Sequence, residues 1–416
     1  KCDSFCYVIF EIHKDMKKMI GLLIFYLFAN LTYAQLKTGA EQMNKYIPLI
    51  KDKKVAIVAN HTSIIQDVHL VDTLLSLHIH IAKILSPEHG FRGNNADGAI
   101  ISDSEYGPDK IPIISLYGNH KKPTAADLKG IDVVIFDMQD VGVRCYTYIS
   151  TMSYVMEACA ENNVAMIVLD RPNPNIGFVD GPVLKKEFAS FVGLHEVPYL
   201  YGMTIGEYAN MVNGEGWLNK AIKCDLKIMP LSFEDGEEYY YHHLSDCEQA
   251  YFKAHYKLPI APSPNLPNMK AVALYPHLCL FEGTDVSVGR GTNKPFQIIG
   301  KPNSHVGNYY FTPISIPGVS DNPPHLGKEC QGIDLSNTRL QCGYWSLSLE
   351  FLLDFYQHSD NKSTFFKAYF DKLAGTDQLR KQIIAGWTEE QIRESWKEDL
   401  QKFKLIREKY LLYSRN

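Results

Sequence analysis

The sequence lacks the signatures of several common kinds of site. No GxGxxG follows a predicted strand and no GxxxxGK(S/T) occurs in the 416 residues, so a dinucleotide or P-loop phosphate site is not supported. The absence of a GxSxG elbow disfavours a serine hydrolase. Cysteine and histidine show no zinc spacing, and we expect neither a metal nor another cofactor. A formal net charge of −5 without a long basic stripe argues against nucleic acid as a partner.

Cysteine is too irregularly placed for a disulfide framework. Seven of the nine cysteines follow residue 34, which is an odd number at irregular spacing. Cys145, Cys159 and Cys279 lie in apolar surroundings, which is typical of small core residues. Cys330 and Cys342 can pair, although nothing in the sequence requires it.

The apolar run at residues 19–31 is too short for a comfortable transmembrane span. Two lysines precede it, and Ala34 follows as a small residue at a plausible cleavage site. These are the three parts of a secretory signal peptide. We therefore expect residues 1–34 to be a signal peptide region, with 1–15 as a gene-start artefact, and the mature chain to be periplasmic or extracellular without stable membrane insertion. An uncleaved membrane anchor is the alternative.

Alternating strands and helices predict an α/β fold. Continuous apolar runs, which are typical of strands buried on both faces, alternate with amphipathic segments. We predict a Rossmann-like parallel sheet domain at residues 45–225 and a smaller α+β C-terminal domain at 226–416, with a cleft between them. The expected strands are 55–59, 81–85, 113–117, 133–136 and 165–169, and the expected helices lie near 71–77 and 149–161.

Polar clusters come directly after four of the expected strands. The carboxyl ends of parallel strands meet at one edge of a sheet, where ligands of open α/β sheets bind. We therefore expect these side chains to line a catalytic or binding cleft. They are Asn60, His61, Glu88, His89, Asp137, Gln139, Asp140, Asp170 and Arg171.

The segment 86–93, Ser-Pro-Glu-His-Gly-Phe-Arg-Gly, concentrates the most chemistry. Pro87 ends strand pairing, so an acid, an imidazole and a guanidinium occupy one tight loop. Glu88 lies close to Phe91 in sequence and is the best candidate for a partly desolvated general acid. In the simpler alternative, Glu88 and Arg92 only pair with each other.

Cleavage of a glycosidic bond typically requires one protonated and one ionised carboxyl group. If Glu88 is the acid, the second carboxylate is Glu282, Asp140 or Asp137. The separation of the two groups decides between inversion and retention of configuration, and it is a property of the fold. A metal site at His61, His89 and Asp140 is a further possibility that no ligand spacing supports.

Four arginines lie in the same loops. The planar guanidinium matches a carboxylate, so an anionic substrate group is a reasonable inference. The alternative is that each arginine pairs with a neighbouring acid. The four are Arg92, Arg144, Arg171 and Arg290.

Eight strings, in order along the chain, resemble those of the exo-β-N-acetylmuramidases, a family long known as a bacterial domain of unknown function. The resemblance runs from about residue 53 to the C-terminus. The strings are ANHTS (59–63), SPEHGFRG (86–93), SLYG (115–118), FDMQDVGVRCYTY (136–148), LDRPNP (169–174), GMTIGE (202–207), PSPNLP (262–267) and FEGT (281–284).

The resemblance implies an enzyme that releases terminal N-acetylmuramic acid from the non-reducing end of peptidoglycan fragments. It places Glu88 at the family's proposed catalytic glutamate, and the lactyl carboxylate of the sugar gives the arginines a partner. The matching strings add Tyr146, Asn265 and Thr284 to the substrate-binding candidates.

One loop departs from the family pattern. Family members usually carry Glu-Gly-Thr-Asn-x-Ser-Glu-Gly-Arg-Gly-Thr, whereas this chain has Asp285 in place of the Asn and Val288 in place of the second Glu. This departure favours, as an alternative, a non-catalytic muropeptide-binding protein on the same scaffold. A cell-wall esterase or amidase is the third hypothesis.

Overall fold

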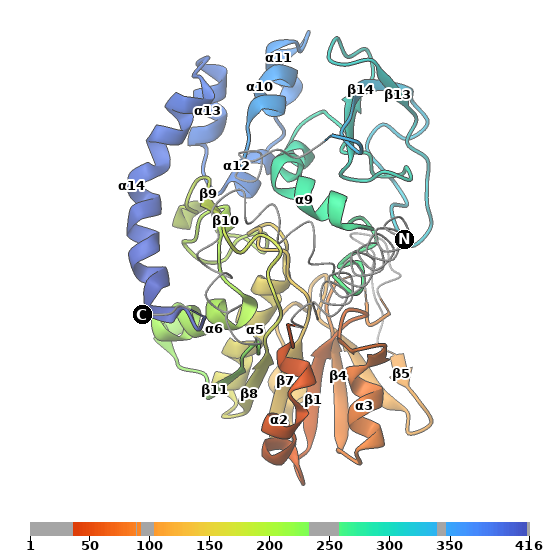
Figure 1. Cartoon of the computed structure of the whole chain (residues 1–416), viewed down its shortest axis with the longest axis vertical. Helices are drawn as coiled ribbons and strands as arrows, with labels where there is room; N and C mark the ends of the chain where they lie inside the picture. The colour runs from red at the N-terminus through yellow and green to blue at the C-terminus, as the bar shows by residue number, and fades with distance from the viewer. Residues whose placement is uncertain (1–35, 89, 93–103, 233–257, 339–346, 414–416) are drawn as a thin grey trace, which may run out of the picture.

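The computed structural model describes residues 36–88, 90–92, 104–232, 258–338 and 347–413. The expected signal peptide region, His89 and Cys342 lie outside them. In the described part of the chain, no helix is long and apolar enough to cross a membrane. The main sheet occupies the lower half of the view in Figure 1, and most of the C-terminal helices lie in the upper half.

A seven-stranded sheet forms the centre of the lower half. Its order is β11-β8-β7-β1-β4-β6-β5, and every neighbouring pair is parallel except β5 and β6. The strands are β1 (Val55–Ala59), β4 (Ile81–Ser86), β5 (Ser104–Tyr106), β6 (Ile111–Ser115), β7 (Val133–Asp137), β8 (Ala165–Leu169) and β11 (Leu226–Met229). The Rossmann-like prediction is confirmed, and all five apolar runs predicted as strands pair in this sheet. Because β11 belongs to it, the sheet extends past residue 225.

Helices cover both faces of the sheet. Val55 and Ile57 of β1 pack in one apolar cluster with α2 and α3, whereas Ala56 and Val58 pack in another with α5 and α6. Burial on both faces explains why the central strands are apolar throughout. The helices of this part are α2 (Met43–Ile50), α3 (Leu70–Ser76), α4 (Ala125–Leu128), α5 (Tyr148–Glu161) and α6 (Ile205–Gly214).

The C-terminal part combines a small antiparallel sheet with helices, as expected for an α+β region. The sheet has the order β12-β14-β13. The elements are α9 (Met269–Leu278), the 3-10 helix η4 (Cys279–Gly283), β12 (Ile298–Lys301), β13 (Tyr309–Phe311), β14 (Cys330–Asp334), α10 (Glu350–Gln357), α11 (Lys362–Phe365), α12 (Tyr369–Ala374), α13 (Gln378–Ile384) and α14 (Glu389–Arg407). Shorter elements elsewhere are η1 (Gly39–Glu41), β2 (Ile64–Ile65), β3 (Val68–His69), β9 (Val179–Asp180), η2 (Lys186–Phe188), β10 (Leu200–Tyr201), η3 (Asn219–Ala221) and η5 (Glu408–Tyr410).

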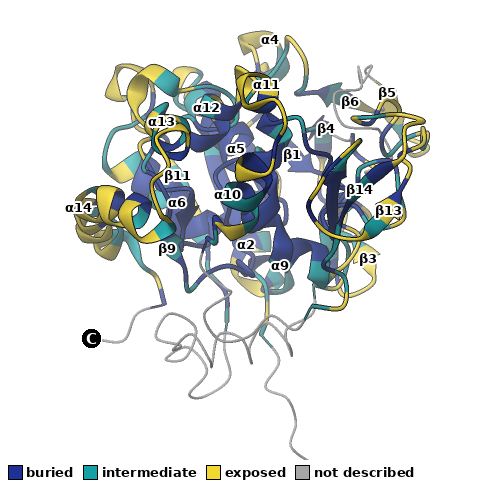
Figure 2. Ribbon diagram, turned by 90° about the horizontal axis from the view of Figure 1, so that it is seen from above, coloured by how far each residue is buried: buried dark blue, intermediate teal, exposed yellow. Residues whose placement is uncertain are grey.

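One hydrophobic core joins the two parts. Its buried residues come from α5 and α6 as well as from α9, α10 and α14. Figure 2 shows α5 and α6 buried near the centre, while α14 exposes its outer face. Cys145, Cys159 and Cys279 are buried free thiols in this core, as predicted, and Cys330 is also free and buried. The C-terminal part therefore packs directly against the sheet layer.

Candidate active site

A cavity of about 480 Å³ lies between the carboxyl edge of the sheet and the C-terminal part. One wall comes from the loops that follow β4, β6 and β7, including the start of α5. The other wall comes from α9, η4, the 290–296 segment and α12. The loops at this edge of the sheet thus open onto a hollow that the second part of the chain completes, and of the polar strand-end candidates Glu88 lines it.

Glu88 lines this cavity from the loop after β4. The strand ends at Ser86, and Pro87 offers no backbone N–H to continue the pairing. The carboxylate is half-buried, and its Oε2 accepts a hydrogen bond from Thr147 Oγ1 at 3.2 Å. A carboxyl group at a cavity wall with a hydroxyl partner is placed to exchange a proton with a bound ligand.

Glu282 lines the same cavity from the opposite wall. It lies in η4, and its Oε1 accepts a hydrogen bond from Arg290 Nε at 2.6 Å. The Arg290 guanidinium also lies 5.1 Å from the centre of the Phe296 ring. The side chains of Glu282 and Arg290 are 22% and 13% exposed, so this ion pair is largely shielded from solvent. Of the three catalytic candidates, the structure brings Glu88 and Glu282 into one cavity.

Asp140 is not among the residues that line the cavity. It is buried, and its Oδ2 accepts hydrogen bonds from the Tyr201 hydroxyl and, at 2.7 Å, from Gly142 N. Burial raises the pKa of Asp140 to about 6, against the opposing effect of these hydrogen bonds. Its described contacts are those of a group that holds the chain after β7 in place.

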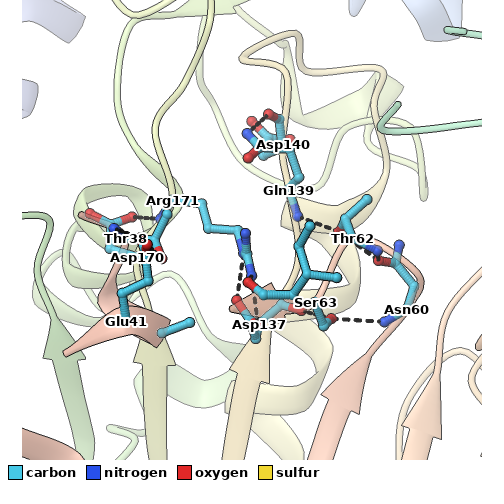
Figure 3. A network of polar contacts seen from close by, with 12 residues as sticks. Thr38, Glu41, Asn60, Thr62, Ser63, Asp137, Gln139, Asp140, Asp170 and Arg171 are labelled. Atoms are coloured by element: carbon cyan, nitrogen blue, oxygen red, sulfur yellow. Dashed lines mark hydrogen bonds and ion pairs between the residues drawn. The ribbon is translucent and has the colours of Figure 1, made fainter. Parts of the chain in front are cut away.

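A buried polar network beneath the cavity uses most of the other strand-end candidates (Figure 3). Asp137 and Arg171 form a two-pronged ion pair at 2.6 and 2.8 Å, with both side chains almost fully buried. Asp170 accepts hydrogen bonds from Arg171 N and from the N-terminus of α6 at Gly206 N. Burial raises the pKa of Asp170 to about 7.

Asn60 and Gln139 belong to the same network. Asn60 Nδ2 donates to the Tyr148 hydroxyl at 2.8 Å, and its Oδ1 accepts from Thr62. Gln139 Nε2 donates to the carbonyl oxygens of Asp140 and Pro172. Neither residue lines the cavity, so both secure the loops that carry it.

The arginines expected to bind an anion are used in other ways. Arg144 is fully buried and donates to the carbonyl oxygens of Pro182, Val197, Leu373 and Ala374. Arg92 is exposed and does not line the cavity. Arg171 is paired with Asp137, and Arg290 is paired with Glu282. Of these four arginines, only Arg290 lines the cavity.

Some of the remaining candidates line the cavity, and others only hold nearby backbone in place. Tyr146 and Asn265 line the cavity, and each also binds a backbone carbonyl, of Pro262 and Val319 respectively. Thr284 is buried and donates to Phe281 O, outside the cavity lining. His61 Nε2 donates to Ala261 O at 2.8 Å. His89 lies outside the described residues.

Several cavity residues gave no usable signal in the sequence. Thr147 and Tyr148 lie within the family-like string at 136–148, but their positions on the cavity wall depend on where α5 begins. Lys121 and Phe191 lie in loops and Lys372 lies on α12, where nothing in the sequence pattern marks them. Among the described residues, no group of three or more His, Cys, Asp and Glu side chains could hold a metal ion.

A cavity with one carboxyl group at the edge of a parallel sheet and a second on the opposite wall fits a class of protein, the carboxyl-dependent glycosidases. The family model described as exo-beta-N-acetylmuramidase NamZ, N-terminal, matches residues 55–270, and its C-terminal counterpart matches 273–413. The chain belongs to this family.

Known proteins resemble the chain over nearly its whole length. The peptidoglycan beta-N-acetylmuramidase NamZ of Bacillus subtilis (strain 168) is 35% identical over 400 residues, which cover 91% of this chain and 92% of that protein. A crystal structure of a DUF1343 family protein from Bacteroides fragilis NCTC 9343 has 44% identity and a TM-score of 0.80, covering 92% of this chain and all of that one. A second such structure from the same organism has 27% identity and a TM-score of 0.74, covering 91% and 99%.

Proposed function

We propose that the chain is an exo-acting glycoside hydrolase that releases terminal β-linked N-acetylmuramic acid from the non-reducing end of peptidoglycan-derived disaccharides and muropeptides. The observation that carries this proposal is the presence of Glu88 and Glu282 in one cavity. The name of the Bacillus subtilis relative, a peptidoglycan beta-N-acetylmuramidase, supports the same substrate.

In the proposed mechanism the two glutamates have different roles. Glu88, next to the hydroxyl of Thr147, donates a proton to the glycosidic oxygen of the leaving sugar. Glu282, ion-paired with Arg290, is the ionised carboxylate that activates water or stabilises the developing positive charge on the sugar ring. The cavity volume of about 480 Å³ lies in the range that encloses a small ligand, which suits an enzyme acting on one terminal sugar.

The departure from the family pattern does not reach the cavity. Asp285 forms an ion pair with Lys301 at 2.8 Å, and Val288 is 2% exposed within the core. Neither residue lines the cavity. The altered loop therefore gives little support to the non-catalytic alternative.

The esterase or amidase alternative lacks a paired base. Ser190 and Ser263 line the cavity, but the described lining contains no histidine. The oxygen of Ser263 accepts a hydrogen bond from Asn265 N at 3.2 Å, which is a loop-forming contact. A nucleophilic serine requires a base within hydrogen-bond reach.

Export is the part of the proposal that rests on the sequence alone. The lysines and the apolar run before Ala34 support cleavage of a signal peptide, and peptidoglycan lies outside the cytoplasmic membrane. Cell fractionation with and without residues 1–34 tests this. Retention of the intact chain in the cytoplasm in both cases would contradict it.

Two substrates with different leaving groups test the catalytic roles. We expect Glu88→Gln to lose about 10²- to 10⁴-fold in kcat on the natural disaccharide, because its leaving sugar needs protonation. The loss on the 4-nitrophenyl glycoside of N-acetylmuramic acid should be smaller, because nitrophenolate leaves without a proton. Glu282→Gln should lose activity on both substrates.

The exposed Glu187 on η2 provides the matched control, and Glu187→Gln should leave both rates unchanged. Turnover by Glu88→Gln at the wild-type rate on the disaccharide would overturn the assignment. Binding of muropeptides by the wild-type chain with no turnover of either substrate would support the non-catalytic alternative instead.

A further inference from the structure

The substrate in the proposed function carries a lactyl carboxylate, which distinguishes N-acetylmuramic acid from N-acetylglucosamine. A cation that faces the cavity is well suited to recognise it, since a carboxylate is costly to desolvate without a partner. Arg144 and Arg171 are buried in other contacts, and Arg92 lies away from the cavity. Arg290 already binds Glu282.

Two lysines on the cavity wall carry no carboxylate partner among the described residues. They are Lys121, in the loop after β6, and Lys372, on α12. The Lys121 ammonium lies 4.7 Å from the centre of the Phe191 ring, and that ring stacks on Tyr154. Lys121 thus reaches the cavity with its charge held against an aromatic face.

The next residue in the chain shows what an ordinary surface lysine does here. Lys122 bridges Glu157 and Glu161 of α5 at 2.6 and 2.7 Å, and it does not line the cavity. The adjacent Lys121 instead lines the cavity with its ammonium against Phe191, and it forms no ion pair with a described carboxylate.

We propose that Lys121 binds the lactyl carboxylate and selects N-acetylmuramic acid over N-acetylglucosamine. This inference rests on the proposed function. The loop that carries Lys121 follows β6, the neighbour of β4, so it lies beside the loop of Glu88. Lys121 is half-buried whereas Lys372 is exposed, and a shielded ammonium attracts a carboxylate more strongly than a solvated one.

The test removes the positive charge of Lys121 by substitution and the negative charge of the lactyl group by amidation. The 4-nitrophenyl glycoside of N-acetylmuramic acid is compared with the same glycoside whose lactyl group is a neutral methyl amide. We expect wild type to prefer the acid by about ten- to hundredfold in kcat/KM, as for a charge-assisted hydrogen bond. In Lys121→Met, kcat/KM for the acid should fall until the preference is lost, whereas kcat/KM for the amide should change little.

Three further variants keep the result interpretable. Lys121→Arg should retain the preference for the acid, and Lys122→Met should behave as wild type. Thermal unfolding of each variant checks that the fold is intact. A Lys121→Met variant that still prefers the acid, or a preference that disappears only in Lys372→Met, would overturn the proposal.

A binding measurement separates this inference from the proposed function. Free N-acetylmuramic acid and its lactyl methyl amide are titrated by calorimetry into wild type and Lys121→Met. Suppose that no substrate is turned over, that wild type binds the acid more tightly than the amide, and that Lys121→Met does not. The proposed enzymatic activity is then refuted, and the proposed role of Lys121 stands. If substrate is turned over but wild type binds the acid and the amide equally, the proposed role of Lys121 is refuted and the proposed enzymatic activity stands.

Discussion

At the scale of single residues, the surroundings of each carboxyl group decide what it can do. Glu88 and Glu282 reach a cavity and meet a hydroxyl and a guanidinium respectively. Asp140 and Asp170 are fully enclosed, and burial raises their pKa values to about 6 and about 7. A carboxyl group can therefore face a ligand-binding cavity at one strand end and hold the local chain in place at another.

The raised pKa of Asp140 predicts a loss of stability as the pH rises. Its pKa in the folded chain exceeds the ordinary value of 3.8 for an aspartate, so folding favours the protonated form. The stability from this group is complete below its unfolded pKa and is lost as the pH rises through about 6. Between about pH 4 and pH 7, the unfolding free energy of wild type should fall relative to Asp140→Asn by on the order of 2–3 kcal/mol.

Urea unfolding of both proteins at each pH measures this difference. The amide of Asp140→Asn still accepts from Tyr201 and Gly142, so the variant keeps the hydrogen bonds and removes only the ionisation. Curves that stay parallel over the whole pH range would show that folding does not shift the pKa of this carboxyl group.

The sequence could locate the strand ends but could not sort the side chains found there. Asp137 and Glu88 both follow buried apolar runs and have the same local pattern. Asp137 lies at the centre of the sheet and is covered by Arg171, whereas Glu88 meets the hollow that the C-terminal part encloses. Only packing against residues that are distant in the sequence separates the two, from Arg171 at 34 positions from Asp137 to the C-terminal wall of the cavity. Lys121 was missed for a similar reason, since its direction depends on Phe191.

At the scale of elements, η4 and α12 pack with their backbones almost in contact. Gly283 follows Glu282 at the end of η4, and a Cβ atom there would lie 2.4 Å from Phe370 Cα. Only glycine permits this approach, since the obstructing atoms are backbone. The position of Glu282 on the cavity wall therefore depends on its neighbour having no side chain.

Gly283→Ala should displace η4 from α12. We expect a loss of about 2 kcal/mol or more in unfolding free energy from overpacking, and a lower kcat because Glu282 moves with η4. For comparison, Gly130→Ala places a Cβ on a backbone at φ +74°, which strains it, but this Cβ meets no atom within 4 Å. It should lower stability by about 1 kcal/mol and leave kcat unchanged. Wild-type kinetics in Gly283→Ala would show that Glu282 does not depend on this contact.

At the scale of the whole molecule, a buried arginine adds four hydrogen bonds to the contacts that join the two parts. Arg144 begins in the loop after β7 and binds two carbonyl oxygens of its own part and two at the end of α12, those of Leu373 and Ala374. Its guanidinium closes the C-terminus of the helix that supplies Lys372 to the cavity.

Arg144→Met should leave the buried carbonyl groups of Pro182 and Ala374 without their described donor, whereas Val197 O keeps Leu184 N and Leu373 O keeps the Cys145 thiol. We expect a loss of about 3 kcal/mol or more in unfolding free energy, since each unsatisfied buried acceptor costs about 1–3 kcal/mol. Hydrogen exchange should be faster at residues 369–374. The control is Arg380→Met, which removes a partly exposed pair with Asp371 of the same helix and should lower stability by about 1 kcal/mol or less. Equal losses in both variants would contradict a special role for Arg144.

The two glutamates proposed as catalytic lie on opposite sides of residue 271, one in each of the segments that the two family models match. Neither segment alone can hold the acid and its counterpart, so a fragment ending at that point would be inert however well it folded. Relatives that recombined there would inherit a proton donor from one parent and its partner from the other. The two segments are therefore expected to have evolved as a unit, each preserving the fit of the other.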